Sequence, residues 1–258
     1  MPWELFSLYL KLPVFALVAA RLGGLLMFQP ILGSLSIPWR VRALLVLGLA
    51  ALLTPLVPWP AQVPDHPAGI MIAMASEVLL GGLIGLLTAA CFLGLEIGGQ
   101  LVAQEAGLAF GQIADPNSDQ EQTVVSLFYV QLAAAVYLVI GGHRVLIAAC
   151  LDTFSTIPLL GDTRVTALGT EALCQALSLS GHVAIRVAAP ALLTLFLVNL
   201  ALGFVSRTMP QLNIIAVGFS VKTLIAFLLM AVALPTAGDT FLTALEHASL
   251  WLNELLGT

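Results

Sequence analysis

The chain has 258 residues, of which 60% are hydrophobic and 9% charged, and its formal net charge is −5. An ordinary soluble domain has about 25% charged residues, so most of this chain cannot face water. It also lacks the cluster of lysine and arginine that nucleic-acid binding requires, which excludes that class of function. We therefore expect an all-α, polytopic membrane protein with a single domain over residues 1–258.

Apolar segments separated by proline, glycine and arginine predict the membrane helices in chain order. The first begins soon after Glu4 and Lys11 without a basic leader, which favours an anchored helix over a cleaved signal peptide. At the other end, leucines interspersed with acidic residues over about 240–256 predict an amphipathic terminal helix. We expect six spans, give or take one. The segments fall at about 12–35, 41–57, 70–97, 123–141, 144–157, 180–205 and 214–235.

Five ionisable residues lie inside or at the edge of these segments. Each would cost about 3 kcal/mol at the centre of a helix that faces lipid, so none is expected to face lipid. They could form a proton or ion relay, but pairing between helices or between subunits is the more common role and is the one we favour. The residues are Arg21, Glu77, Glu96, Arg186 and Lys222.

Small residues recur at every fourth position of the third segment, which lets helices approach closely in a membrane. They are Gly81, Gly85 and Ala89, followed by Ala90, Gly94 and Gly98.

Chemistry-bearing motifs are not found. The cysteines at 91, 150 and 174 are isolated in apolar sequence and the four histidines have no partner at metal-ligand spacing, so we expect no metal and no cofactor. A nucleophile elbow, a zinc protease motif and a phosphate-binding loop are all missing from the sequence, so we expect no enzymatic activity.

Two polar runs interrupt the apolar pattern. Residues 98–116 are rich in glycine and amides, and backbone of this kind at membrane depth is stable only inside protein or beside a water-filled cavity. In the second run, residues 199–213, Pro210 ends one helix, so Arg207 and Gln211 are expected in a tight turn between two apolar helices.

Together these runs resemble the FliR family of flagellar export-gate proteins, whose injectisome counterpart is the SctT family. The resemblance covers nearly the whole chain and is closer to the flagellar proteins. It is carried by Ile37–Arg42, Gln104–Phe110 through Asp115-Pro116, Gly141–Arg144, Asp152–Phe154 to Pro158, Ala189-Pro190, and Asn199–Gly203 to Lys222.

The resemblance implies a structural subunit of the type III export gate in the bacterial inner membrane and flagellar basal body. Helical hairpins would be built with FliP and FliQ into a hetero-oligomeric ring that associates with FlhB and FlhA, contacts membrane lipid and passes unfolded flagellar proteins. A loop over about 106–122 would plug the channel, although Glu105 stands where the family pattern suggests an apolar residue. The implied plug residues are Gly107, Leu108, Ala109, Phe110, Gly111, Gln112, Asp115 and Pro116.

Unpaired charges, small residues and the turn are expected to pack against other subunits. The alternative function is a proton-coupled transporter of small solutes that uses Glu77, Glu96 and Lys222 as relay groups. The expected packing residues are Arg21, Glu77, Gly81, Gly85, Gly94, Gly98, Arg186, Arg207, Pro210, Gln211 and Lys222.

Overall fold

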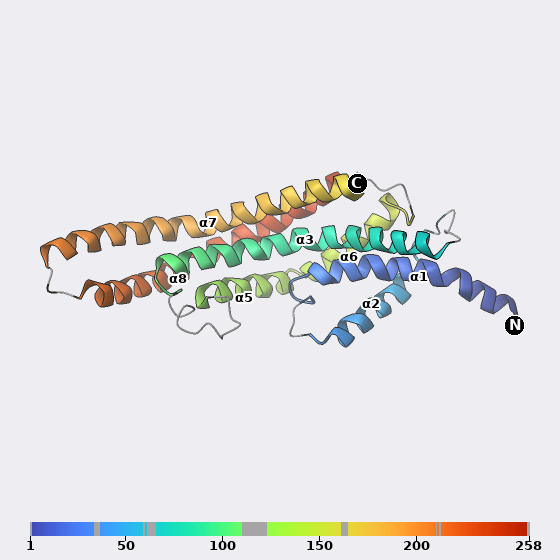
Figure 1. Ribbon diagram of the computed structural model, residues 1–258, viewed down its shortest axis with the longest axis horizontal. Coiled ribbons are helices and arrows are strands. Elements are labelled where there is room, and N and C mark those ends of the chain that lie inside the picture. The colour runs from blue at the N-terminus through green and yellow to red at the C-terminus, as the bar shows by residue number, and fades with distance from the viewer. Residues whose placement is uncertain are drawn as a thin grey trace. The chain divides into compact units, whose positions relative to one another are not determined.

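The computed structural model describes residues 2–33, 37–58, 60, 66–109, 123–160, 165–209, 211 and 213–256 (Figure 1). These residues form helices joined by turns, with no strand among them. The expected all-α, polytopic fold is confirmed. The described helices are α1 (Pro2–Phe28), α2 (Trp39–Leu53), α3 (Pro67–Glu105), α5 (Val124–Val139), α6 (Gly142–Thr156), α7 (Val165–Thr208) and α8 (Ile214–Leu256).

Three of these helices are much longer than a membrane span. Helices α3, α7 and α8 contain 39, 44 and 43 residues. At 1.5 Å per residue each exceeds about 55 Å, whereas the hydrocarbon core is about 30 Å thick. Within the described ranges, three helices are long and apolar enough to cross a membrane, or four if α5 and α6 count as one broken span. The expected count of six, give or take one, is wrong for the described residues because α2, α5 and α6 contain only 15 or 16 residues and the apolar stretch of α1, Leu12–Phe28, is also short.

Helix ends also differ from the predicted segments. The glycine-rich residues 98–105 continue α3 as helix, and the segment at 214–235 is continuous with the expected terminal helix, so both belong to α8. Pro235 lies inside α8 without ending it. Neighbouring groups in a membrane helix can satisfy the carbonyl that a proline leaves free, so a proline alone does not mark a helix end there.

A glycine turn separates α5 from α6. Gly141 has a φ of +71°, a left-handed conformation that is strained for residues with a side chain. Its N–H donates to the Leu138 carbonyl at 3.1 Å, and its carbonyl accepts from the backbone N–H of Arg144 at 2.8 Å. Glycine at this position therefore lets the chain leave one helix and start the next within two residues.

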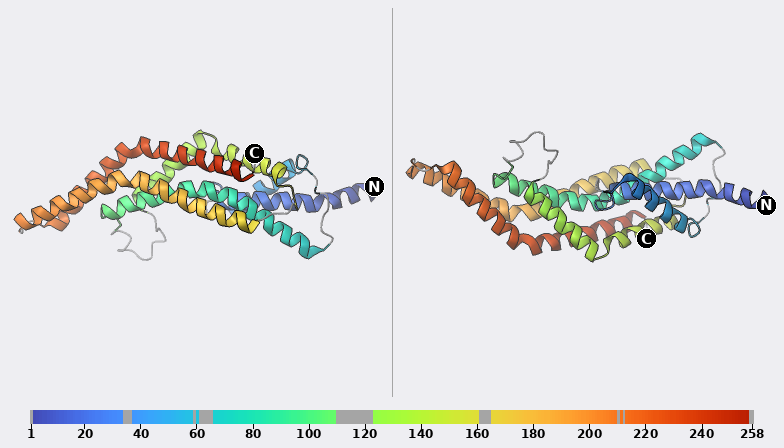
Figure 2. Two further views of the ribbon diagram at one scale, coloured as in Figure 1. Left: turned by 90° about the horizontal axis from the view of Figure 1, so that it is seen from above. Right: turned by 90° about the horizontal axis from the view of Figure 1, so that it is seen from below.

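The chain divides into two compact units. The first comprises residues 1–90, 138–177 and 246–258, and the second comprises 91–137 and 178–245. In the first unit, α1 packs against α2 (Figure 1). In the second, Phe92 makes edge-to-face contacts with Tyr137 and Phe241, at centroid distances of 5.7 and 4.9 Å. The end of α7 and the start of α8 form an antiparallel hairpin (Figure 2).

Candidate functional site

Arg21 lies at the centre of a buried polar cluster in the first unit. Its side chain is 0% exposed, and its Nε donates to the Glu77 carboxylate at 2.6 Å. The two remaining guanidinium nitrogens donate to the Thr153 hydroxyl at 3.0 Å and to the Ile157 carbonyl at 3.1 Å. The guanidinium carbon also lies 4.2 Å from the centre of the Phe154 ring. Arg21 therefore ties α1 to α3 and to the end of α6.

For Arg21 and Glu77, the favoured interpretation of pairing between helices is confirmed within this chain. Because both side chains are buried inside one unit, any effect they have on subunit packing is indirect. Thr153 and Phe154 carried no local signal for this role, since only tertiary structure brings α6 against Arg21.

The four-residue glycine spacing of α3 is used by helices of the same chain. A Cβ at Gly81 would overlap the backbone carbonyl of Arg21 in α1. Further along α3, a Cβ at Gly94 would lie 2.7 Å from Val183 Cβ in α7, and one at Gly98 would lie 3.1 Å from the Ala184 carbonyl oxygen. These glycines allow close approach of α1 and α7 to α3, as small residues do in membrane proteins.

At Gly85, a Cβ would meet the Leu25 carbonyl oxygen of α1 at 2.6 Å. Gly99 is equally confined, because a Cβ there would lie 2.6 Å from Ser126 Cα. At Gly98 and Gly99 the missing side chains make room for neighbouring helices, so glycine is accommodated within the helical residues 98–105.

Helix α3 ends in a glycine cap where the expected plug loop begins. Gly107 has a φ of +82°, its N–H donates to the Gln104 carbonyl at 3.0 Å, and the Leu108 N–H donates to the Ala103 carbonyl at 2.9 Å. This pair of bonds is the Schellman motif, which satisfies the last carbonyls of a helix. Gly107 therefore stops α3 at a defined residue. Ala109 follows in the same turn, whereas Phe110, Gly111, Gln112, Asp115 and Pro116 lie outside the described residues.

Glu105, in the last turn of α3, contacts α7. The Asn199 side-chain amide donates a hydrogen bond to its carboxylate. An acidic residue is therefore accommodated at this position because α7 supplies a polar partner.

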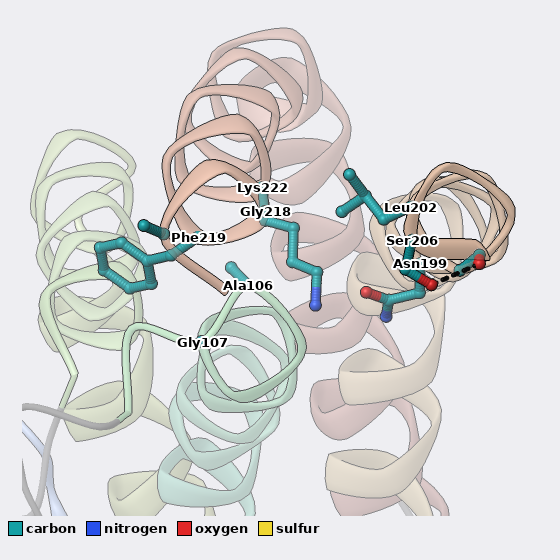
Figure 3. Close-up of a pocket in the computed structure, with 10 residues that line it drawn as sticks. Ala106, Gly107, Asn199, Leu202, Ser206, Gly218, Phe219 and Lys222 are labelled. Atoms are coloured by element: carbon teal, nitrogen blue, oxygen red, sulfur yellow. Dashed lines mark hydrogen bonds between the residues drawn. The ribbon is translucent and has the colours of Figure 1, made fainter. Parts of the chain in front are cut away.

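A pocket of about 610 Å³ opens beside this helix end, in the second unit. Lys222 reaches from α8 toward the side on which the end of α3 and Asn199 lie (Figure 3). The Ser206 hydroxyl donates to the Gly203 carbonyl at 2.6 Å. The pocket is lined by Ala106, Gly107, Asn199, Leu202, Gly203, Ser206, Ala216, Gly218, Phe219 and Lys222.

The turn between α7 and α8 lies where the sequence predicts it. Helix α7 ends at Thr208 and α8 begins at Ile214. Arg207 and Gln211 are exposed, and Pro210 lies outside the described residues. The side chain of Asn213 accepts from the Ala216 N–H at 3.4 Å, which is the position of an N-cap. Arg186, also expected in packing, is exposed on α7.

Comparison with protein families gives a match to bacterial export proteins, family 1, over residues 12–248. The chain belongs to this family. The flagellar biosynthetic protein FliR of Caulobacter vibrioides is 29% identical over 89% of this chain and 91% of its own length. FliR of Escherichia coli is 30% identical over 83% of this chain and 82% of its own length.

An injectisome relative matches as well: the Yop proteins translocation protein T of Yersinia pestis is 25% identical over 73% of this chain and 72% of its own length. The resemblance to the FliR family is thus confirmed. Family membership and the long apolar helices identify the chain as a multi-pass inner-membrane protein of the flagellar apparatus and as a component of a type III export apparatus.

Proposed function

We propose that this protein is the FliR-type structural subunit of the flagellar export gate, which forms with FliP and FliQ the channel through which flagellar proteins leave the cytoplasm. The observation that carries the proposal is the family match over residues 12–248. FlhB and FlhA would associate with this gate, and its cargo would be unfolded flagellar proteins.

Outward apolar surface on the long helices supports an assembled state. Of the most apolar stretch of each helix, 67% is buried in α3 but only 22% in α7 and 11% in α8. Helices α7 and α8 are also longer than the hydrocarbon core, so lipid alone does not cover them. Neighbouring subunits supply the remaining cover.

The loop over about 106–122 would plug the channel, with Phe110 as its bulkiest apolar side chain. Its sequence supports this role, since glycines give the backbone freedom and an apolar constriction excludes water and ions. The cap at Gly107 supports it further by fixing where the loop leaves α3.

Co-expression tests the proposal. Alone in detergent, the chain should aggregate, whereas co-expression with FliP and FliQ should give a stable complex that contains all three. In a strain that lacks its own FliR, the chain or a chimera with the host protein should restore swimming. A monodisperse, well-folded monomer that gains nothing from the partners would contradict the proposal.

The transporter alternative gains no support. Its relay required Glu77, but that carboxylate is bound to Arg21 in a buried pair. The relay is therefore not needed to explain Glu77, and the family match points to export.

A further inference from the structure

Lys222 is a cation in an apolar helix for which the described residues provide no ion pair. It is half-buried and lies about 12 Å into α8, eight residues after the first. Over the parts of the chain that the structure describes, the ion pair found is that of Arg21 with Glu77. Placing a lysine in an apolar membrane helix costs free energy unless its ammonium group faces water or an anion. We therefore expect Lys222 to have a partner that carries negative charge.

Among the residues that the structure describes, those lining the pocket around Lys222 include no aspartate or glutamate. Asn199 and Ser206 are its neutral polar members, whose side-chain oxygens can accept a hydrogen bond from the ammonium group but carry no charge to balance it. Glu105 is held by Asn199 and does not line the pocket. The cationic end of Lys222 therefore faces a cavity whose described walls cannot neutralise it.

Small residues make up half of the pocket wall. A volume of about 610 Å³ is within the range of about 300–1,000 Å³ typical of small-molecule sites, so the pocket has room for a side chain. Small residues on membrane helices are characteristic of contacts with another helix. Sites for anionic lipid headgroups instead gather several basic residues, whereas Lys222 is the one cation among the described residues that line this pocket. The small members are Ala106, Gly107, Gly203, Ala216 and Gly218.

We infer that this pocket receives an aspartate or glutamate side chain from a different kind of subunit in the assembly, whose carboxylate pairs with Lys222 Nζ. The inference rests on the proposed function, because it requires a gate with other subunits. It gives the hairpin of α7 and α8 a defined role: one inserted carboxylate fixes the hairpin in register against its neighbour.

Cross-linking tests the pairing directly, because the chain has only two lysines, Lys11 and Lys222. The Lys11→Arg variant leaves Lys222 as the one side-chain amine. A carbodiimide joins an amine to an adjacent carboxylate as an amide, with loss of water and no spacer. Treating the complex purified with FliP and FliQ should therefore link Lys222 to an aspartate or glutamate of another subunit, which peptide mass spectrometry locates.

Several results would overturn the inference. One is a link to a carboxylate of the same chain, such as Glu105 or Asp115, or to a second copy of this chain. Another is the absence of any link. A third is phospholipid that co-purifies with the complex and is lost in the Lys222→Met variant.

Variants provide the second measurement. Lys222→Met should lower the amount of co-purified partner by at least about tenfold, as expected when one member of a desolvated charge pair is removed. Lys222→Arg should retain the partner. So should the control Ser220→Ala on the same helix, because the Ser220 hydroxyl donates to the Ala216 carbonyl of α8 itself. If the unaltered chain fails to bind FliP and FliQ, the proposed function fails. If it binds them and Lys222→Met does so equally well, only the pairing is wrong.

Discussion

Arg21 and Lys222 are both cations within apolar helices, but their surroundings differ. Arg21 is fully buried, with its ion pair, its hydrogen bonds and its aromatic contact all supplied by the same chain. Lys222 lies in an open pocket without an ion pair among the described residues. A charge that is paired within its own chain stabilises the fold of that chain. A charge that faces a pocket without an ion pair can instead bind a group from another subunit. The two regions should therefore respond differently to substitution.

The largest effect is expected at Arg21. Arg21→Met leaves the Glu77 carboxylate buried without its partner, which should destabilise the fold by about 3–5 kcal/mol. Thermal unfolding of the complex in detergent, followed by circular dichroism, measures the loss.

The double variant Arg21→Met with Glu77→Leu is the control for Arg21. Because it removes both charges together, it should recover much of the lost stability. Lys222→Met should instead lower the amount of co-purified partner and leave the buried cluster around Arg21 intact. An Arg21→Met protein as stable as the parent would remove the distinction between the two regions.

A change in the turn between α7 and α8 should affect assembly more than folding. A four-residue helical insertion after Met209 rotates and displaces α8 relative to α7, and so separates Lys222 from Asn199. Loss of partner binding and of swimming is expected, while α1 and its contacts with Glu77 remain folded.

Pro210→Ala provides the milder comparison at the same turn. It keeps the chain length, so it should reduce swimming much less than the insertion does. Intact motility and complex formation after the insertion would show that the geometry of the turn is unimportant.

Gly81 in α3 and Gly23 in α1 differ in the space around them. A methyl group at Gly81 overlaps the Arg21 backbone, whereas nothing lies within 4 Å of a Cβ at Gly23. Gly81→Ala should therefore destabilise the fold by about 1–3 kcal/mol through overpacking.

Gly23→Ala is the matched control on α1. It should be neutral or stabilising by about 0.5–1 kcal/mol, because alanine restricts the unfolded chain more than glycine does. Equal unfolding temperatures for the two variants would show that α3 does not need the close approach at Gly81.

Much of this fold is readable from the sequence, but helix lengths are not. The positions of the apolar segments and of the turn at 207–213 follow from hydropathy and proline, which act locally. The continuation of α3 through Gly98 and Gly99 depends on the neighbouring helices that fill the space beside them. Local propensity, which disfavours glycine in helices, points the other way.

The site shows the same division. Arg21, Glu77 and Lys222 stand out because charge is rare in apolar segments. Which of them pair depends on contacts between residues far apart in the chain, such as Arg21 with Thr153. Sequence spacing carries no information about such contacts, so the closed cluster and the open pocket could be distinguished only in three dimensions.

Changes in the expected plug should have the smallest effect on folding and assembly. Deleting about residues 108–114 removes the chain beyond the cap at Gly107. In the intact chain the last carbonyls of α3 accept from the Gly107 and Leu108 N–H groups. After the deletion Asp115 follows Gly107 and its N–H can replace that of Leu108, so α3 should still end there. The gate should therefore assemble normally. Its permeability should rise, because the apolar bulk that excludes water and ions is gone.

Phe110→Gly should leak less than the deletion, since one side chain is lost while the loop remains. Uptake of a small dye or ion flux in cells that express the assembled gate measures the leak, and co-purified FliP and FliQ verify assembly. An assembled deletion complex with unchanged permeability would place the seal in the partner subunits. The loop would then be a connector, and the functional part of this end of the molecule would be the pocket at Lys222 alone.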